Sequence, residues 1–212
     1  GLFTYHFFLF MALRIAPPVE ANLVNYLWPL LIVVLSPLFF KNYSLNSKHF
    51  VAAVLGFSGA FFIVTGGKLA FEASGLLGYV FALMSALIWA CYSLLVKKVA
   101  PFSTGAVGLF CLVSGCLSLL CHFVLEAPYS FEFSDVPFLL VLGVGPMGAA
   151  FYLWDYSIKT GDPRIIGSLS YLTPMLSTLL LIIFGHGHFA FVTAIAMVLI
   201  IAGAVIGSKQ HF

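Results

Sequence analysis

The chain has 212 residues, of which 62% are hydrophobic and 8% charged, and its mean hydropathy is +1.13. A soluble domain carries about 25% charged residues, and a chain of this length cannot bury so much apolar side chain in one aqueous core. The composition therefore predicts a membrane protein with several spans, and the net charge of +2 gives no indication of nucleic-acid binding.

The apolar runs predict eight transmembrane helices, since a bilayer is crossed by roughly 20 apolar residues. Turn and capping residues separate the runs, among them Pro17-Pro18, Gly66-Gly67 and Pro101. In chain order the predicted helices cover residues 1–15, 18–40, 48–66, 75–97, 102–125, 136–158, 164–185 and 189–208.

The basic residues of the predicted loops indicate an orientation. Eight spans place alternate loops on opposite sides, and one side receives seven of the nine Lys and Arg residues. The other side receives only Arg14 and Lys68. Because basic loops stay in the cytoplasm, we expect the C-terminus and Gly1 on the cytoplasmic side of the membrane.

A Tyr-Leu-x-Pro motif occurs twice, 145 residues apart, as "NYLWP" from Asn25 and "SYLTP" from Ser170. The loop charges direct helix 18–40 from outside to inside and helix 164–185 from inside to outside. The two copies are therefore predicted to be inverted, as in secondary transporters with a binding site at the membrane midplane.

The duplication also predicts the domain organisation. The first three predicted helices match the last three, and the second copy has two further helices before its matched three. We therefore expect two helices before Gly1 and a complete molecule of ten, with inverted five-helix repeats. Residues 1–67 would be the remainder of the first repeat, and residues 74–208 the second repeat.

The repeated motif predicts a polar cavity at mid-membrane depth. Proline has no N–H, so Pro29 and Pro174 each leave a carbonyl one turn back without its helical partner. In lipid such a carbonyl must face protein or a water-filled cavity. One helical face carries Asn22, Asn25, Tyr26 and Pro29, and the matching face carries Gly167, Ser170, Tyr171 and Pro174.

We interpret these two faces as the wall of a binding site for a small polar or zwitterionic solute. The alternative is a pair of proline kinks that only shape packing. Trp89 lies deep in helix 75–97, on one face with Ser85 and Tyr92, and is expected in the cavity. Trp154 lies near a helix end and fits either the cavity or an interfacial anchor.

Other patterns receive structural interpretations. Asp155 is one turn from Lys159 and can pair with it. His186 and His188 have too few companions to predict a metal site. Small residues at four-residue spacing fit close helix packing, either within the chain or between subunits of a homo-oligomer; these are Ala52, Gly56 and Ala60, and Gly203 and Gly207.

No catalytic constellation is evident. Membrane-embedded chemistry needs a nucleophile with a base, a carboxylate pair or a metal cluster, and the sequence contains no HExxH and no paired intramembrane aspartates. We therefore expect no enzyme activity, no cofactor and no metal.

Four stretches carry a family resemblance: "VNYLWPLL", "FALMSALIWACYSLLVKK", "DYSIKTGD" and "GSLSYLTPMLSTLLL". They resemble the drug/metabolite transporter superfamily with EamA-type domains, and most closely its bacterial aromatic amino acid exporter branch. The resemblance implies a multi-pass protein of the bacterial inner membrane that exports small metabolites by alternating access. Carried over by motif, the cavity lining would comprise Asn25, Trp28, Trp89, Tyr92, Trp154, Ser170 and Tyr171.

The expected function is export of small neutral metabolites, with aromatic or other neutral amino acids as the substrate class. Two alternatives stay open. The substrate could be another metabolite or a drug within the same superfamily, or the chain could be a truncated membrane protein that transports nothing.

Overall fold

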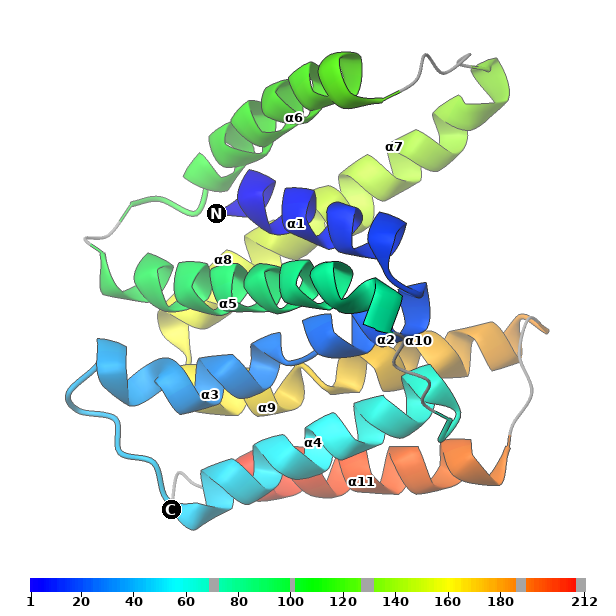
Figure 1. Cartoon of the computed structure of the whole chain (residues 1–212). Helices are drawn as coiled ribbons and strands as arrows, with labels where there is room; N and C mark the ends of the chain where they lie inside the picture. Colours follow the sequence, from blue (N-terminus) through cyan, green and yellow to red (C-terminus); the bar gives the residue numbers. More distant parts are fainter. Residues whose placement is uncertain (69–72, 100–101, 127–131, 186–189, 209–212) are drawn as a thin grey trace.

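The helices lie side by side as rods, with α6 and α7 along one edge (Figure 1). The computed structural model describes residues 1–68, 73–99, 102–126, 132–185 and 190–208. Within these ranges the regular elements are all helical. They are α1 (Leu2–Ile15), α2 (Pro18–Asn25), α3 (Trp28–Phe39), α4 (Ser47–Thr65), η1 (Ala73–Gly75), α5 (Leu76–Lys98), α6 (Ala106–Leu125), η2 (Phe133–Asp135), α7 (Val136–Val144), η3 (Gly145–Ala149), α8 (Ala150–Thr160), α9 (Pro163–Leu169), α10 (Leu172–Ile183) and α11 (Phe191–Ser208).

Six helical stretches of the described residues are long and apolar enough to cross a membrane. They are Pro18–Phe39, Ser47–Thr65, Ala73–Lys98, Ala106–Leu125, Phe133–Thr160 and Pro163–Ile183. Two further helices, α1 and Phe191–Gly207 of α11, are apolar but shorter. The prediction of an all-helical chain with several membrane spans is confirmed.

Two of the predicted spans are each broken at the Tyr-Leu-x-Pro motif. Helix α2 ends at Asn25 and α3 begins at Trp28, while α9 ends at Leu169 and α10 begins at Leu172. Each proline falls in the first turn of the following helix, where its missing N–H has no partner to lose. The sequence predicted one continuous, kinked helix at each place, and the structure contains two shorter helices instead.

The span Phe133–Thr160 is also irregular. A π-helical turn, η3, separates α7 from α8 and contains Gly145, Pro146 and Gly148. Proline removes a backbone donor from the helical ladder, and π-turns occur frequently at functional sites. The prediction of a regular helix over 136–158 missed this turn.

Close approaches at small residues hold the bundle together. A Cβ added to Gly203 of α11 would lie 2.7 Å from the Ala52 carbonyl oxygen and 3.0 Å from the Gly56 nitrogen of α4. A Cβ on Gly207 would lie 2.9 Å from the Cβ of Ser168 on α9. These small residues are thus used for close helix packing within the chain.

The start of α9 is tied to the connection between α3 and α4. The Asp162 carboxylate caps α9 by accepting from the Arg164 backbone N–H at 2.8 Å and pairs with the Arg164 guanidinium at 2.6 Å. The same guanidinium donates to the Ser44 carbonyl at 2.7 Å and lies 4.7 Å from the centre of the Tyr43 ring. Burial alone would raise the pKa of Asp162, but these hydrogen bonds and the charge of Arg164 hold that pKa below its ordinary value.

We expect Asp162→Ala to lower the free energy of unfolding by about 1–2 kcal/mol, because the cap and the ion pair are both lost. Asp162→Asn keeps a capping oxygen and should cost less. Because the pKa of Asp162 is lowered by folding, its ion-pair contribution is present above the ordinary aspartate pKa of about 3.9 and is lost as the pH falls through the lowered value.

Thermal unfolding in detergent micelles at pH 7 and at acid pH measures this. The gap in midpoint between the wild type and Asp162→Asn should close on acidification. A gap that widened on acidification would contradict the assignment.

Candidate functional site

All three tryptophans of the chain meet at one place, although they belong to three helices. Trp28 begins α3, Trp89 lies in α5 and Trp154 lies in α8. The ring centres of Trp28 and Trp154 are 5.3 Å apart, those of Trp89 and Trp154 are 5.8 Å apart, and those of Trp28 and Trp89 are 6.4 Å apart. These are distances of direct aromatic contact.

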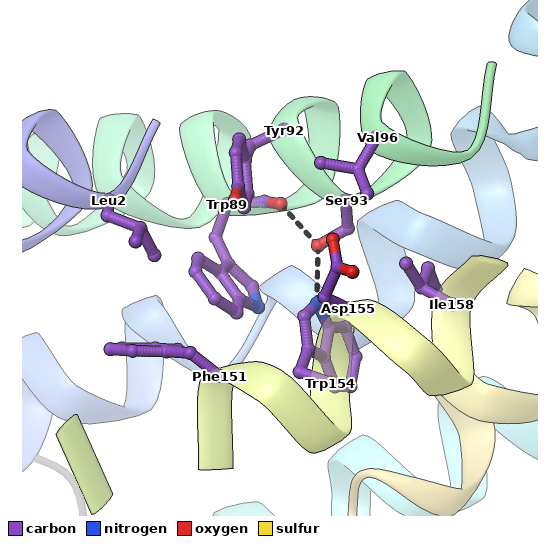
Figure 2. A pocket seen from close by; sticks show the side chains of 9 residues that line it. All are labelled: Leu2, Trp89, Tyr92, Ser93, Val96, Phe151, Trp154, Asp155 and Ile158. Carbon is purple, nitrogen blue, oxygen red and sulfur yellow. Dashed lines mark hydrogen bonds between the residues drawn. The ribbon is translucent and has the colours of Figure 1, made fainter. Parts of the chain in front are cut away.

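Trp89 is the centre of a larger aromatic cluster. Its ring centre is 5.0 Å from that of Tyr5, 5.6 Å from that of Tyr92 and 5.7 Å from that of Phe151. Beside it lies a pocket with no room for a water molecule, which we call the aromatic pocket (Figure 2). Its lining consists of Leu2, Trp89, Tyr92, Ser93, Val96, Phe151, Trp154, Asp155 and Ile158.

Ser93 fixes the orientation of one indole ring. The Trp154 Nε1–H donates to Ser93 Oγ at 3.0 Å, and the Ser93 hydroxyl donates to the Trp89 carbonyl at 2.8 Å (Figure 2). The first bond joins α8 to α5, and the second lies within α5. Trp154 thus lines the aromatic pocket and is held there by a specific hydrogen-bond partner.

Asn25 is buried at the end of α2 and joins three helices. Its side-chain amide donates to the Tyr5 hydroxyl at 3.4 Å, and its side-chain oxygen accepts from the Ser85 hydroxyl at 2.9 Å. Because the Tyr5 ring contacts Trp89, Asn25 is connected to the aromatic cluster through Tyr5.

Asp155 brings a carboxylate to the aromatic pocket. Only 3% of its surface is exposed, and its Oδ2 pairs with Lys159 Nζ at 2.7 Å. The same ammonium group donates to the Phe102 carbonyl at 3.0 Å and lies 3.7 Å from the centre of the Phe102 ring. The predicted pair one helical turn apart is thus confirmed.

Three of the predicted site residues lie elsewhere, in an open groove of about 370 Å³ between α2, α4 and α10. We call this the α2–α10 groove. It is more polar than the aromatic pocket, because amide, phenol and hydroxyl groups line it. Its lining consists of Pro18, Val19, Asn22, Tyr26, Ile63, Val64, Pro174, Ser177 and Thr178.

The remaining predicted residues lie where the two broken helices cross. Tyr171 is fully buried, and its hydroxyl donates to the Tyr26 carbonyl at 3.2 Å. The Ser170 hydroxyl donates to the Ile166 carbonyl within its own helix at 2.7 Å. Pro29 packs against α9, where a Cβ on Gly167 would lie 2.9 Å from the Pro29 carbonyl oxygen.

The sequence thus predicted one continuous site, and the structure divides its residues among three places. Asn25, Trp28, Trp89, Tyr92 and Trp154 belong to the aromatic cluster or support it. Asn22, Tyr26 and Pro174 line the α2–α10 groove, and Pro29, Ser170 and Tyr171 form the crossing.

Sequence reasoning missed Tyr5, Ser93 and Phe151. Two signals were available for them. Ser93 follows Trp89 by one helical turn, and Phe151 shares a face with Trp154 at a spacing of three residues. Nothing in the pattern of α1 distinguishes Tyr5 from its aromatic neighbours.

A metal centre has no support among the described residues, where no group of three His, Cys, Asp or Glu side chains is placed to hold an ion. His186 and His188, the two histidines weighed above, lie outside the described residues.

Apolar, membrane-spanning helices that are interrupted beside a pocket are typical of secondary membrane transporters. The chain belongs to the EamA-like transporter family, whose model matches residues 1–65 and 76–208. The resemblance noted from the sequence motifs is therefore confirmed.

Individual relatives agree. The protein named aromatic amino acid exporter YddG of Ancylobacter novellus is 42% identical over 210 residues, which cover 98% of this chain and 73% of that protein. The protein of the same name from Escherichia coli is 27% identical over 169 residues, which cover 76% of this chain and 57% of that protein. A solved structure titled "Crystal structure of protein" superposes with a TM-score of 0.94 at 42% identity, covering 99% of this chain and 75% of that chain.

We expect Ser93→Ala to lower the free energy of unfolding by about 1–3 kcal/mol, because the buried Trp154 N–H loses its acceptor. Ser118→Ala on α6, whose side chain is exposed, is the matched control and should change it little. Thermal unfolding in detergent, followed by tryptophan fluorescence, measures both variants. Equal midpoints for the two would show that the Ser93 contact contributes nothing.

Proposed function

We propose that this chain carries the transport path of an exporter for aromatic and other neutral amino acids, and that it works by alternating access rather than by catalysis. The observation that supports this most is the contact of all three tryptophans with one another, beside the aromatic pocket and two broken helices. The names of the relatives supply the same substrate class.

The pocket suits a substrate with a flat apolar side chain. Aromatic pairs in the observed arrangements contribute about 0.5–1.5 kcal/mol each beyond area burial. A substrate ring that entered among Trp28, Trp89 and Trp154 would replace contacts between the tryptophans with similar contacts between the tryptophans and the substrate. The cost of opening the cluster would therefore be largely offset for aromatic substrates and not for small hydrophilic ones.

We further propose that the chain holds eight of ten membrane helices arranged as inverted repeats. The two breaks fall at equivalent places of the motif, and the Tyr26–Tyr171 bond joins residues at the repeat spacing of 145. The two stretches matched by the family model also support a division into residues 1–67 and 74–208. The loop charges favour a multi-pass protein of the bacterial inner membrane with a cytoplasmic C-terminus.

In that orientation the present conformation is open to the outside. The α2–α10 groove involves the ends of α2 and α4 that the loop charges place outside. The aromatic pocket, which has no room for a water molecule, lies in the half that they place toward the cytoplasm. Lys97 Nζ on α5 donates to the Lys159 and Gly161 carbonyls at 3.0 and 2.7 Å, and α9 lies against α3 at Gly167.

Alternating access would then exchange these two arrangements. The Lys97 bonds and the α3–α9 contact would open toward the cytoplasm, and α2 would close on α10. A substrate would enter the aromatic pocket from the cytoplasm and leave through the groove. Inverted repeats make such an exchange natural, because each half can adopt the conformation of the other.

We expect Trp89→Ala and Asn25→Ala in the full-length protein to lower the rate of phenylalanine flux by about tenfold or more, because one removes the central ring of the cluster and the other its support. Flux of labelled phenylalanine in proteoliposomes measures this. Phe138→Ala on α7, whose side chain is 77% exposed, is the matched control and should transport normally.

Wild-type flux that persists in both pocket variants would contradict the site. Absence of flux for every amino acid, in a wild type that does transport other metabolites or drugs, would contradict the substrate class and leave the fold unaffected.

A further inference from the structure

Asp155 has an oxygen that the fold leaves unused. Its Oδ1 is the one buried side-chain nitrogen or oxygen atom without a hydrogen-bond partner in the part of the chain that the structure describes. Leaving a buried acceptor unpaired is energetically unfavourable, and more so for a charged group. An unpaired buried atom in a native structure calls for an explanation, and a bound group that supplies the missing partner is one.

The carboxylate lies at the aromatic pocket. Figure 2 shows Asp155 on α8 between Trp154 and Ile158, directed toward Ser93 on α5. The pocket lining contains this one carboxylate and no Lys, Arg or His. The charge of the lining therefore favours a cationic group.

Lys159 is not the missing partner of Asp155 Oδ1. Its ammonium group bonds the other carboxylate oxygen, and it is shared with the Phe102 carbonyl and ring. These contacts hold Lys159 away from Oδ1 and fix the carboxylate in place. Oδ1 remains available to a second donor that enters through the pocket.

We propose that Asp155 Oδ1 binds the primary ammonium group of the substrate while the substrate's aromatic ring packs among the tryptophans. Trp89 and Trp154 line the same pocket and add the attraction of their ring faces for a cation. The ligand class is thus an arylalkyl ammonium, which includes aromatic amino acids and also aromatic amines without a carboxylate. Which of these compounds is transported depends on the proposed function. Their binding at Asp155 does not depend on it.

The test compares two ligands that differ only at the group in question. Phenethylamine carries an ammonium where 2-phenylethanol carries a hydroxyl. Equilibrium binding of each labelled compound to the purified full-length protein is measured for the wild type, Asp155→Asn and Asp162→Asn. Asp162→Asn is the matched control, because it removes the other ion-paired aspartate at the cytoplasmic end without touching the pocket lining.

We expect Asp155→Asn to weaken phenethylamine binding by about ten- to a hundredfold, the range of a charge-assisted hydrogen bond, and to leave 2-phenylethanol binding unchanged. Retained 2-phenylethanol binding also shows that the variant is folded. Asp162→Asn should change neither affinity.

An equal loss for both ligands would overturn the proposal, because Asp155 would then only hold Lys159 and the helix. Unchanged binding of both, or no phenethylamine binding to the wild type, would overturn it as well. Selective loss of phenethylamine binding in a protein that transports no amino acid would support this inference and contradict the proposed function, so the two failures are distinguishable.

Discussion

The hydrogen bond from the Tyr171 hydroxyl to the Tyr26 carbonyl links the two interrupted helices at the level of their breaks. A carbonyl that leaves a helical ladder within the membrane must find a partner in the protein or in a water-filled cavity. Tyr26 finds one in the other copy of its own motif. The neighbouring Asn25 turns the opposite way, toward Tyr5 and Ser85. The two helix breaks thus set both the crossing of the broken helices and the support of the aromatic pocket.

The two sides of this crossing differ in their polar groups and in the space between the helices. On one side of it, the aromatic pocket has no room for a water molecule, and the Lys97 bonds join α5 to the end of α8. On the other side, α2 and α10 leave a groove lined by amide, phenol and hydroxyl groups. A chain built from two similar copies would be expected to pack alike on both sides. The difference between the two sides supports the proposed alternating mechanism, in which one conformation exposes one side at a time.

Composition and motif predicted much of the fold, because membrane spans are set by long apolar runs and helix breaks by proline. The interior of the site was less predictable. Tyr171 looked like a lining residue from its spacing, but its phenol is used to pair a backbone carbonyl. Trp154 could be assigned only through Ser93, which belongs to another helix, and Tyr5 only through Asn25. Such partners depend on how half-helices rotate after a break, and a periodic pattern within one helix does not contain that information.

The central claim is that substrate passes between α2 and α10 by movement about the crossing. The most direct measurement is phenylalanine flux through the variant Asn22→Cys/Ser177→Cys, in which the native cysteines are replaced. Flux is measured before and after a bifunctional, disulfide-forming reagent joins the two walls of the groove. The account predicts saturable flux that stops on cross-linking and returns on reduction. Undiminished flux through the cross-linked protein would contradict it.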